Sequence, residues 1–285
     1  MKKIYYLLIL FLCLNALQSS AQTISLDDDK SAGLKGGISY LSNNVFMGRT
    51  DTVTSKIIAP QLLYTFKSGF YVSGTLSFIL NQKQHTLDGS SLEAGYNYAV
   101  NDNLYGGVSF SKYFYGSNST RITSAISSIF NAYLNYDLGD IITPELSVSY
   151  SISDRNVHND IFVNPGITHQ FIIDQFLHSN NALEISPEFS LNSGTQNFYN
   201  GYFSRRRKNL NTANQLSTAD QLKLTNYTLL DYEAQLPIKF KAENYLISLT
   251  PSFAFPQNKL PDNISSKLAN KRSLFYFEAS VLYKF

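Results

Sequence analysis

The stretch Phe70–Leu80, FYVSGTLSFIL, decides the fold class of this chain, because its side chains alternate between two kinds. Positions 70, 72, 74, 76, 78 and 80 carry Phe, Val, Gly, Leu, Phe and Leu, whereas the positions between them carry Tyr, Ser, Thr, Ser and Ile. A period of two indicates a β-strand whose two faces meet different surroundings. The same alternation recurs at 92–100 and 145–153, and no stretch shows a convincing helical period.

Turn signals divide the rest of the chain into strands of similar length. Short polar turns alternate with longer polar connections, which fall at 44–55, 82–88, 116–122, 154–159, 193–223 and 256–271. The resulting twelve candidate strands are 34–43, 56–66, 70–81, 89–100, 104–115, 123–137, 141–153, 160–173, 182–192, 224–240, 245–255 and 273–285. Antiparallel strands joined in this way are typical of a transmembrane β-barrel. The sequence therefore predicts an all-β fold, a single antiparallel barrel of about twelve strands, with ten and fourteen as alternatives.

The placement of charge separates a membrane barrel from a soluble one. A soluble barrel exposes Lys, Glu and Asp and turns its apolar face inward. Here only 15% of the residues are charged, and the face opposite the apolar one is small and polar. A face of Phe, Leu, Val and Tyr would aggregate in water. We therefore expect the apolar face to meet lipid and the polar face to line a lumen.

The N-terminus has the composition of an export signal. Two lysines precede an apolar segment, and small residues up to Ala21 offer a cleavage site. We expect a signal peptide at 1–21, a flexible periplasmic lead-in at 22–33 and a barrel at 34–285. The only cysteine, Cys13, lies in the signal, so the mature chain is expected to have no disulfide and no thiolate metal site.

Net charge excludes one class of partner. The chain has 23 Lys and Arg against 21 Asp and Glu, and removal of two signal lysines leaves 21 of each. A nucleic-acid-binding protein needs a basic surface. No nucleic-acid partner is therefore expected.

The C-terminus carries a more specific signal. Alternate positions from Phe275 hold Phe, Phe, Ala, Val, Tyr and Phe, and the chain ends on the pair Tyr283 and Phe285. This strand resembles the terminal β-signal of Gram-negative outer-membrane proteins, without pointing to one family among them. The resemblance implies that the barrel-assembly machinery reads these residues, that outer-membrane lipids and lipopolysaccharide surround the barrel, and that both termini are periplasmic.

The inward face supplies the candidate functional residues. Seven acidic residues are predicted to face the lumen: Glu93, Glu145, Glu184, Glu188, Asp231, Glu233 and Glu278. Five tyrosines are predicted to line it with them: Tyr71, Tyr105, Tyr113, Tyr133 and Tyr276. A ring of negative charge in a water-filled lumen favours cations. We therefore expect a narrow, weakly cation-favouring channel for small solutes.

Two alternatives remain open from the sequence. The carboxylates are also consistent with a structural network in a non-transporting barrel, which would act as an anchor or bind a protein partner or ligand through its outer loops. The longest connection carries Arg205, Arg206, Arg207 and Lys208, which suit phosphate recognition but equally a solvated loop. Aromatic residues at 198–203 offer a third role for this loop, folding inward as a constriction.

Catalysis and metal binding find little support. His158, Asn159 and Asp160 form the best local cluster, but no serine stands out as a nucleophile beside a histidine. Histidines are not paired at metal-binding spacings, and no phosphate-binding glycine loop is present. We expect no enzyme activity, no metal site and no cofactor.

Prolines conflict with the strand plan. A closed barrel offers no edge strand to shelter a missing N–H group. The sequence therefore predicts bulges, or later strand starts, at the six prolines inside proposed strands: Pro60, Pro144, Pro165, Pro187, Pro237 and Pro251.

Overall fold

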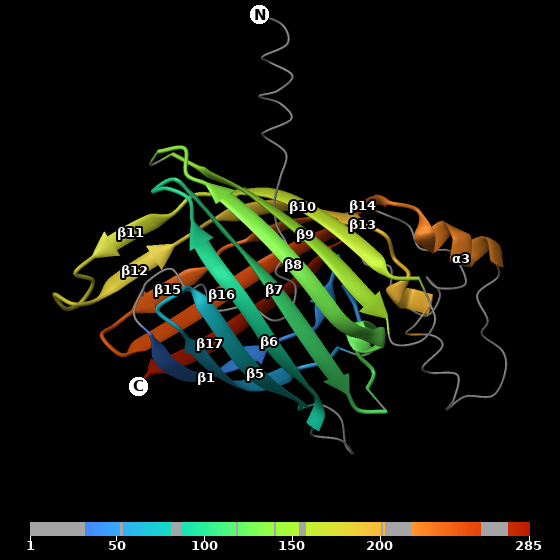
Figure 1. The fold of residues 1–285 in the computed structure, drawn as a ribbon, viewed down its shortest axis with the longest axis horizontal. Coiled ribbons are helices and arrows are strands. Elements are labelled where there is room, and N and C mark those ends of the chain that lie inside the picture. The colour runs from blue at the N-terminus through green and yellow to red at the C-terminus, as the bar shows by residue number, and fades with distance from the viewer. Residues whose placement is uncertain are drawn as a thin grey trace, which may run out of the picture.

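The wall of the protein is a closed antiparallel barrel of twelve strands, as the alternation predicted (Figure 1). The computed structural model describes residues 32–51, 54–80, 87–117, 119–139, 141–153, 158–200, 202, 218–257 and 273–285. The barrel closes where the first strand, β1, pairs with the last strand, β17, over seven residue pairs from Lys35–Lys284 to Leu41–Glu278. Within these residues, no helix is long and apolar enough to cross a membrane.

Fifteen hydrogen-bonded segments make up the wall, because three of the twelve strands are interrupted. The continuous strands are β1 (Gly33–Leu41), β4 (Ile57–Thr65), β5 (Phe70–Ile79), β6 (Leu87–Ala99), β7 (Leu104–Tyr115), β8 (Ile126–Tyr136), β9 (Thr143–Ser153), β16 (Tyr245–Pro256) and β17 (Leu274–Lys284). The interrupted strands are β10 (Asp160–Thr168) with β11 (Phe171–Asp174), β12 (Ala182–Ile185) with β13 (Glu188–Gly194), and β14 (Thr228–Gln235) with β15 (Ile238–Lys241).

Two predicted strand starts are wrong because short helices precede the strands. The α-helix α3 (Thr218–Thr225) occupies the first residues of the strand predicted at 224–240. The 3-10 helix η1 (Ile122–Ala125) occupies those of the strand predicted at 123–137. Both helices are too short to give a repeating helical period in the sequence, so the alternation of the following strand was extended into them.

The sidedness of the strands agrees with the prediction. On β5 and β6, outward-facing Leu76 and Leu92 are 45% and 60% exposed on the isolated chain, whereas inward-facing Tyr71 is 3% exposed. On β9, Ser147, Ser149 and Ser151 are buried and point inward. Lipid would cover the exposed apolar side chains, since a protein with so many of them on its outer face would aggregate in water.

Aromatic side chains gather at the short-turn end of the outer face. With no tryptophan in the chain, this girdle is made of Phe and Tyr. Phe66 contacts Tyr64 and Phe70 with ring centroids 4.7 and 5.4 Å apart. Tyr283 lies 5.0 Å from both Tyr245 and Phe285.

Bulges were predicted at the prolines, and for Pro60, Pro165 and Pro251 this prediction is wrong. Each keeps regular antiparallel pairing with one neighbouring strand, opposite Ile38, Leu146 and Phe277 respectively. In an antiparallel strand a residue directs its N–H and C=O groups to the same neighbour, so only one ladder lacks a donor. For Pro144 the alternative prediction, a later strand start, applies, because β9 begins at Thr143 and not at 141. The register shifts fall elsewhere, at residues 77–78, 126–128 and 192–193.

Three prolines lie together where neighbouring strands are interrupted. Pro187 separates β12 from β13, Pro237 separates β14 from β15, and Pro251 lies beside them on β16. The carbonyl oxygens of two of these prolines accept hydrogen bonds from the neighbouring strand. Ser186 N–H donates to the Pro237 carbonyl at 2.9 Å, and Leu236 N–H donates to the Pro251 carbonyl at 3.0 Å. Each missing donor therefore coincides with a break in the adjacent strand. Beyond the row, the hairpin β11–β12 extends from the barrel rim (Figure 1).

Two inward tyrosines lie flat against glycines of the next strand. Tyr71 is the cross-strand partner of Gly95, and Tyr133 is that of Gly107. A Cβ atom at Gly95 would lie 2.5 Å from Cζ of Tyr71, and one at Gly107 would lie 2.6 Å from Cε1 of Tyr133. Glycine at these positions therefore lets each ring lie along the wall instead of crossing the lumen.

We predict that Gly95→Ala destabilises the barrel by about 1–3 kcal/mol, because the new methyl group displaces the Tyr71 ring from a buried site. Reversible urea unfolding of the refolded protein in detergent measures the change. Gly74→Ala is the matched control, since its Cβ would meet only Leu92 at an ordinary 3.5 Å. Equal stability of the two variants would contradict the packing role of Gly95.

Candidate functional site

The first outer connection folds into the barrel instead of covering it. A two-residue hairpin, β2 (Val45–Phe46) and β3 (Arg49–Thr50), turns at Met47 and Gly48, both with positive φ. Val45, Phe46 and Met47 are each 3% exposed. We call the segment 43–51 the plug, because every one of its residues is buried inside the wall.

An apolar cluster surrounds the tip of the plug. Phe46 lies edge-on to Phe162 of β10 and to Phe198, with ring centroids 5.7 and 5.1 Å apart. The cluster draws residues from several outer connections and from the wall: Phe46, Met47, Ile122, Ile126, Phe162, Phe198, Tyr199, Tyr202, Leu224 and Leu230. Three of these aromatics belong to the connection for which folding inward was one hypothesis. Side chains thus fill this part of the lumen.

Asp51 fastens the base of the plug to the connection before β8. Its Oδ1 accepts hydrogen bonds from the backbone N–H of Ile122 at 2.7 Å and from the Asn44 side chain at 2.9 Å. Arg121 in turn donates from Nη2 to the Asn44 side-chain oxygen at 3.3 Å. Burial raises the pKa of the Asp51 carboxyl group above its ordinary value, against the opposing effect of these donors.

Asp160 fastens the longest connection in the same way. It is 2% exposed and accepts hydrogen bonds from the backbone N–H groups of Asn197 and Phe198, at 2.6 and 2.7 Å, and from the Thr195 hydroxyl at 2.7 Å. His158, two residues earlier, is exposed. In the cluster His158, Asn159 and Asp160, the first two residues are therefore exposed to solvent, and the carboxylate of Asp160 is used to hold a loop.

On the opposite side of the lumen, the tip of the plug approaches two acidic residues of β14, Asp231 and Glu233. A Cβ atom at Gly48 would lie 2.6 Å from Cβ of Asp231, so only glycine permits this approach. Asp231 is 0% exposed, and neither of its carboxylate oxygens accepts a hydrogen bond from the described residues. Its neighbour Glu233 accepts hydrogen bonds from Asn192 and Gln235, both at 3.1 Å, and from the hydroxyl of Tyr276.

The other predicted lumen carboxylates occupy separate parts of the wall. Glu93 accepts hydrogen bonds from Tyr71 at 2.7 Å and Ser111 at 2.6 Å. Glu184, near the short turns, forms ion pairs with Lys239 at 3.0 Å and Lys241 at 2.9 Å. The remaining three lie on β9, β13 and β17: Glu145, Glu188 and Glu278. Part of the predicted set of lumen carboxylates is therefore already hydrogen-bonded or ion-paired within the protein.

The predicted lumen tyrosines all face inward. Tyr133 donates to the side-chain oxygen of Asn97 at 2.9 Å, and Tyr105 to Asp137 at 3.5 Å. Tyr113 packs against the apolar cluster, where its ring stacks on Tyr115 with centroids 6.1 Å apart. Their hydroxyl groups are used mainly to hold neighbouring polar side chains.

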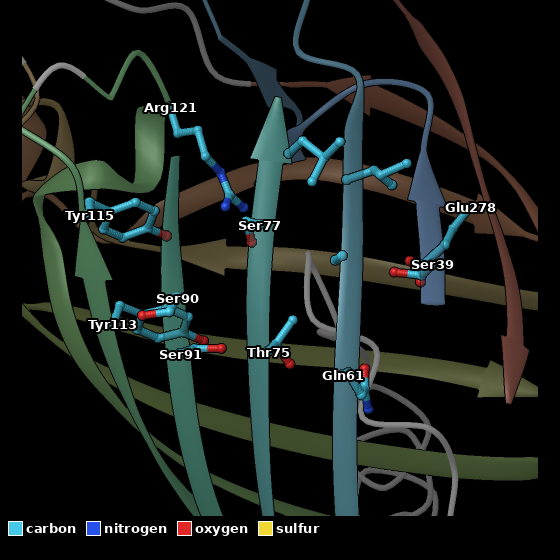
Figure 2. Close-up of a pocket in the computed structure, with 13 residues that line it drawn as sticks. Ser39, Gln61, Thr75, Ser77, Ser90, Ser91, Tyr113, Tyr115, Arg121 and Glu278 are labelled. Atoms are coloured by element: carbon cyan, nitrogen blue, oxygen red, sulfur yellow. The ribbon is translucent and has the colours of Figure 1, made fainter. Parts of the chain in front are cut away.

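A polar cavity lies inside the wall, on the side of β1 and β4 to β7 (Figure 2). One of its lining residues, Arg121, donates a hydrogen bond to Asn44 of the plug. The cavity and the open solvent beside it together make up about 660 Å³ of empty space. Hydroxyl and amide side chains dominate its lining, with one cation and one anion: Ser39, Leu41, Ile57, Ala59, Gln61, Thr75, Ser77, Ser90, Ser91, Tyr113, Tyr115, Arg121 and Glu278. Glu278 and Tyr113 were predicted lumen residues, whereas Arg121 was assigned to an outer loop.

Sequence reasoning missed the plug and the two residues that fasten it, Asp51 and Arg121. One signal was present. Three consecutive apolar residues followed by glycine, Val45 to Gly48, are unusual in an outer loop that is otherwise polar. Three other predictions, the signal peptide, the lead-in up to residue 31 and the basic run 205–208, lie outside the described residues. Among the described residues, no group of three or more His, Cys, Asp or Glu side chains is arranged to hold a metal ion.

Solved structures of outer-membrane channels share this architecture. An outer membrane channel from Pseudomonas putida F1 matches with a TM-score of 0.55 and 10% identity, over 93% of this chain and all of that one. The KdgM porin matches with a TM-score of 0.51 and 12% identity, over 88% and 99% of the two chains. The chain has the fold of an outer-membrane β-barrel.

The likeness shows the fold alone, because all these identities are low. LpxR from Salmonella typhimurium matches as well as the porin does, with a TM-score of 0.51 and 8% identity over 88% of this chain and all of that one. No protein-family profile and no curated protein matches the sequence. The choice between channel and enzyme therefore rests on the interior of this barrel.

We predict that Asp51→Ala loosens the plug, because the buried Ile122 N–H group loses its acceptor at a cost of about 1–3 kcal/mol. Met47→Cys reports the change, since Met47 is 3% exposed and the expected mature chain has no other cysteine. Maleimide labelling of this cysteine should be slow in the parent and about tenfold or more faster with Asp51→Ala. Asp102→Ala, at an exposed turn, is the control, and equal labelling of both variants would contradict the role of Asp51.

Proposed function

We propose that the protein is a narrow outer-membrane channel for small polar solutes, held nearly closed by its own plug. The observation that carries this proposal is the polar cavity inside the wall, whose lining residue Arg121 is hydrogen-bonded to Asn44 of the plug. Among the described residues, the plug and other connecting segments obstruct the lumen together with a few wall side chains such as Phe162 and Leu230. The plug is held by hydrogen bonds and by the packing of Phe46 and Met47, and such a loop opens at lower cost than a strand of a closed barrel.

A weak preference for cations is the second part of the proposal. Glu93, Glu188 and Glu233 face the lumen, while the lysines 239 and 241 are paired with Glu184 near the short turns. The positive charges of Arg49 and Arg121 lie at the plug, because Arg49 belongs to it and Arg121 is hydrogen-bonded to Asn44. A lumen with an excess of carboxylates concentrates cations and excludes anions.

A non-transporting barrel is the competing candidate, and one observation favours it. The apolar cluster around Phe46 fills the lumen at the level of the plug with side chains that have no polar role. In that case the loops packed around the cluster would present a rigid surface to a partner or ligand. Opening of the plug separates the two candidates.

Orientation and biogenesis follow from the same assignment. We place the short turns and both termini of the mature chain in the periplasm, with the signal removed after Ala21. Tyr283 lies near the end of the closing strand β17 and is half-buried, and Phe285 follows the strand and is exposed, which is consistent with recognition by the barrel-assembly machinery.

Single-channel recording in planar lipid bilayers tests the proposal. The purified mature protein should give small, infrequent openings, and replacing residues 44–50 by a Gly-Ser linker should give larger and longer ones. A potassium chloride gradient should give a reversal potential of cationic sign. Combined Glu188→Gln and Glu233→Gln should move it towards zero, because two lumen charges are removed.

A correctly folded control is essential, because misfolded barrels also disturb bilayers. Asp102→Ala, in a turn outside the lumen, should leave conductance and reversal potential unchanged. Absence of discrete openings in the linker variant, although it folds, would reject the channel and support the non-transporting barrel. Anion preference would reject the assignment of selectivity.

A further inference from the structure

The polar cavity carries one positive and one negative side chain on different parts of its lining. Arg121 enters from the connection after β7, and Glu278 projects from β17 (Figure 2). Between them the lining offers hydroxyl and amide groups, including those of Gln61, Thr75 and Ser77. A site with separated opposite charges and a polar floor recognises a ligand that carries both charges.

Arg121 has hydrogen-bonding capacity that the protein does not use. The residue is 7% exposed, and its Nε–H group finds no acceptor among the described residues. Its guanidinium group lies over the ring of Tyr115, 5.4 Å from the centroid, and donates to Asn44 at 3.3 Å. These contacts fix the group in place. A buried, fixed guanidinium with a free donor suits a carboxylate ligand, which it can bind through two parallel hydrogen bonds.

Glu278 offers the complementary charge. It lies opposite Leu41 on β1 and Thr250 on β16 in the strand register, and points into the lumen. Ser39, on the adjoining strand, provides a hydroxyl group beside it (Figure 2). A carboxylate with a hydroxyl neighbour in a water-accessible cavity suits an ammonium group, which donates up to three hydrogen bonds.

The separation of the two charges limits the length of the ligand. From β7 to β17 the wall covers five strand steps, with β6, β5, β4 and β1 between. At about 4.8 Å per step this is an arc of roughly 24 Å, and two inward-reaching side chains leave on the order of 10 Å between their charged ends. An extended peptide gains about 3.5 Å per residue, so the termini of a di- or tripeptide lie roughly 7–10 Å apart.

We propose that this cavity binds zwitterionic di- or tripeptides, with Arg121 holding the C-terminal carboxylate and Glu278 holding the N-terminal ammonium group. The hydroxyl and amide side chains between them pair with the peptide backbone. This inference deepens the proposed function by naming the solute class, and rests on it for the route by which the peptide enters. Binding itself does not require conduction.

Isothermal titration calorimetry of the full mature barrel in detergent tests the site, with triglycine as the probe. Triglycine should bind, whereas N-acetyl-triglycine and triglycine amide should each bind about tenfold or more weakly, because each lacks one charge-assisted contact. Free glycine should bind weakly as well, because its charges are too close together to reach both residues.

Variants assign each end of the peptide. Glu278→Gln should weaken triglycine about tenfold and leave N-acetyl-triglycine unaffected, since that peptide has no ammonium group. Arg121→Gln should weaken triglycine and remove the distinction between the free acid and the amide. Asp102→Ala is the control, because this exposed turn residue does not line the cavity and should leave the affinity unchanged.

The outcomes separate this inference from the channel. Arg121 also contacts the plug, so Glu278→Gln and the blocked peptides decide the question if Arg121→Gln fails to fold. Equal affinity for triglycine and its blocked forms, no binding of triglycine, or glucose or glucuronate binding as tightly, would overturn the proposal. Peptide binding without conductance would reject the channel alone, and conductance without peptide binding would reject the site alone.

Discussion

Closure of the wall by β1 and β17 is the constraint on which the rest of the structure depends. In lipid, an unpaired backbone N–H or C=O group costs several kcal/mol, so a sheet survives there only without edges. Seven residue pairs between these two strands remove the edges. Once closed, every strand must place alternate side chains on lipid and on the lumen, which is why the period of two extends along the chain.

The lumen then sets a second problem, which the connecting segments solve. A twelve-stranded wall is too wide for small inward side chains to fill. Tyr71 and Tyr133 lie along the wall on their glycines and therefore add little across the lumen. The plug, held by Asp51, and the loop held by Asp160 fill the outer part instead, and leave the cavity beside β4 to β7. Function, in this arrangement, is a property of loops on a rigid frame.

The strands of the wall can be predicted from the sequence, whereas the packing of the interior cannot, for a physical reason. Alternation at 70–80 is local, so sidedness, strand number and the inward position of residues such as Glu93 and Tyr71 can be predicted from it. Contacts of Phe46 with Phe162 and Phe198 join distant segments and leave no periodic trace. The prolines were misjudged similarly: Pro251 is tolerated because a neighbouring strand is interrupted at Pro237, a coincidence of register that no single strand reveals.

The make-up of the apolar cluster also orders the assembly of the molecule. Its members come from segments between Phe46 and Leu230, and they converge only inside a completed cylinder. The plug hairpin lies near the start of the described chain, whereas its neighbours in the cluster extend as far as Leu230. Long-range contacts of this kind form slowly. The apolar cluster around the plug can therefore be complete only after the strands that bear Phe162 and Leu230 have joined the wall.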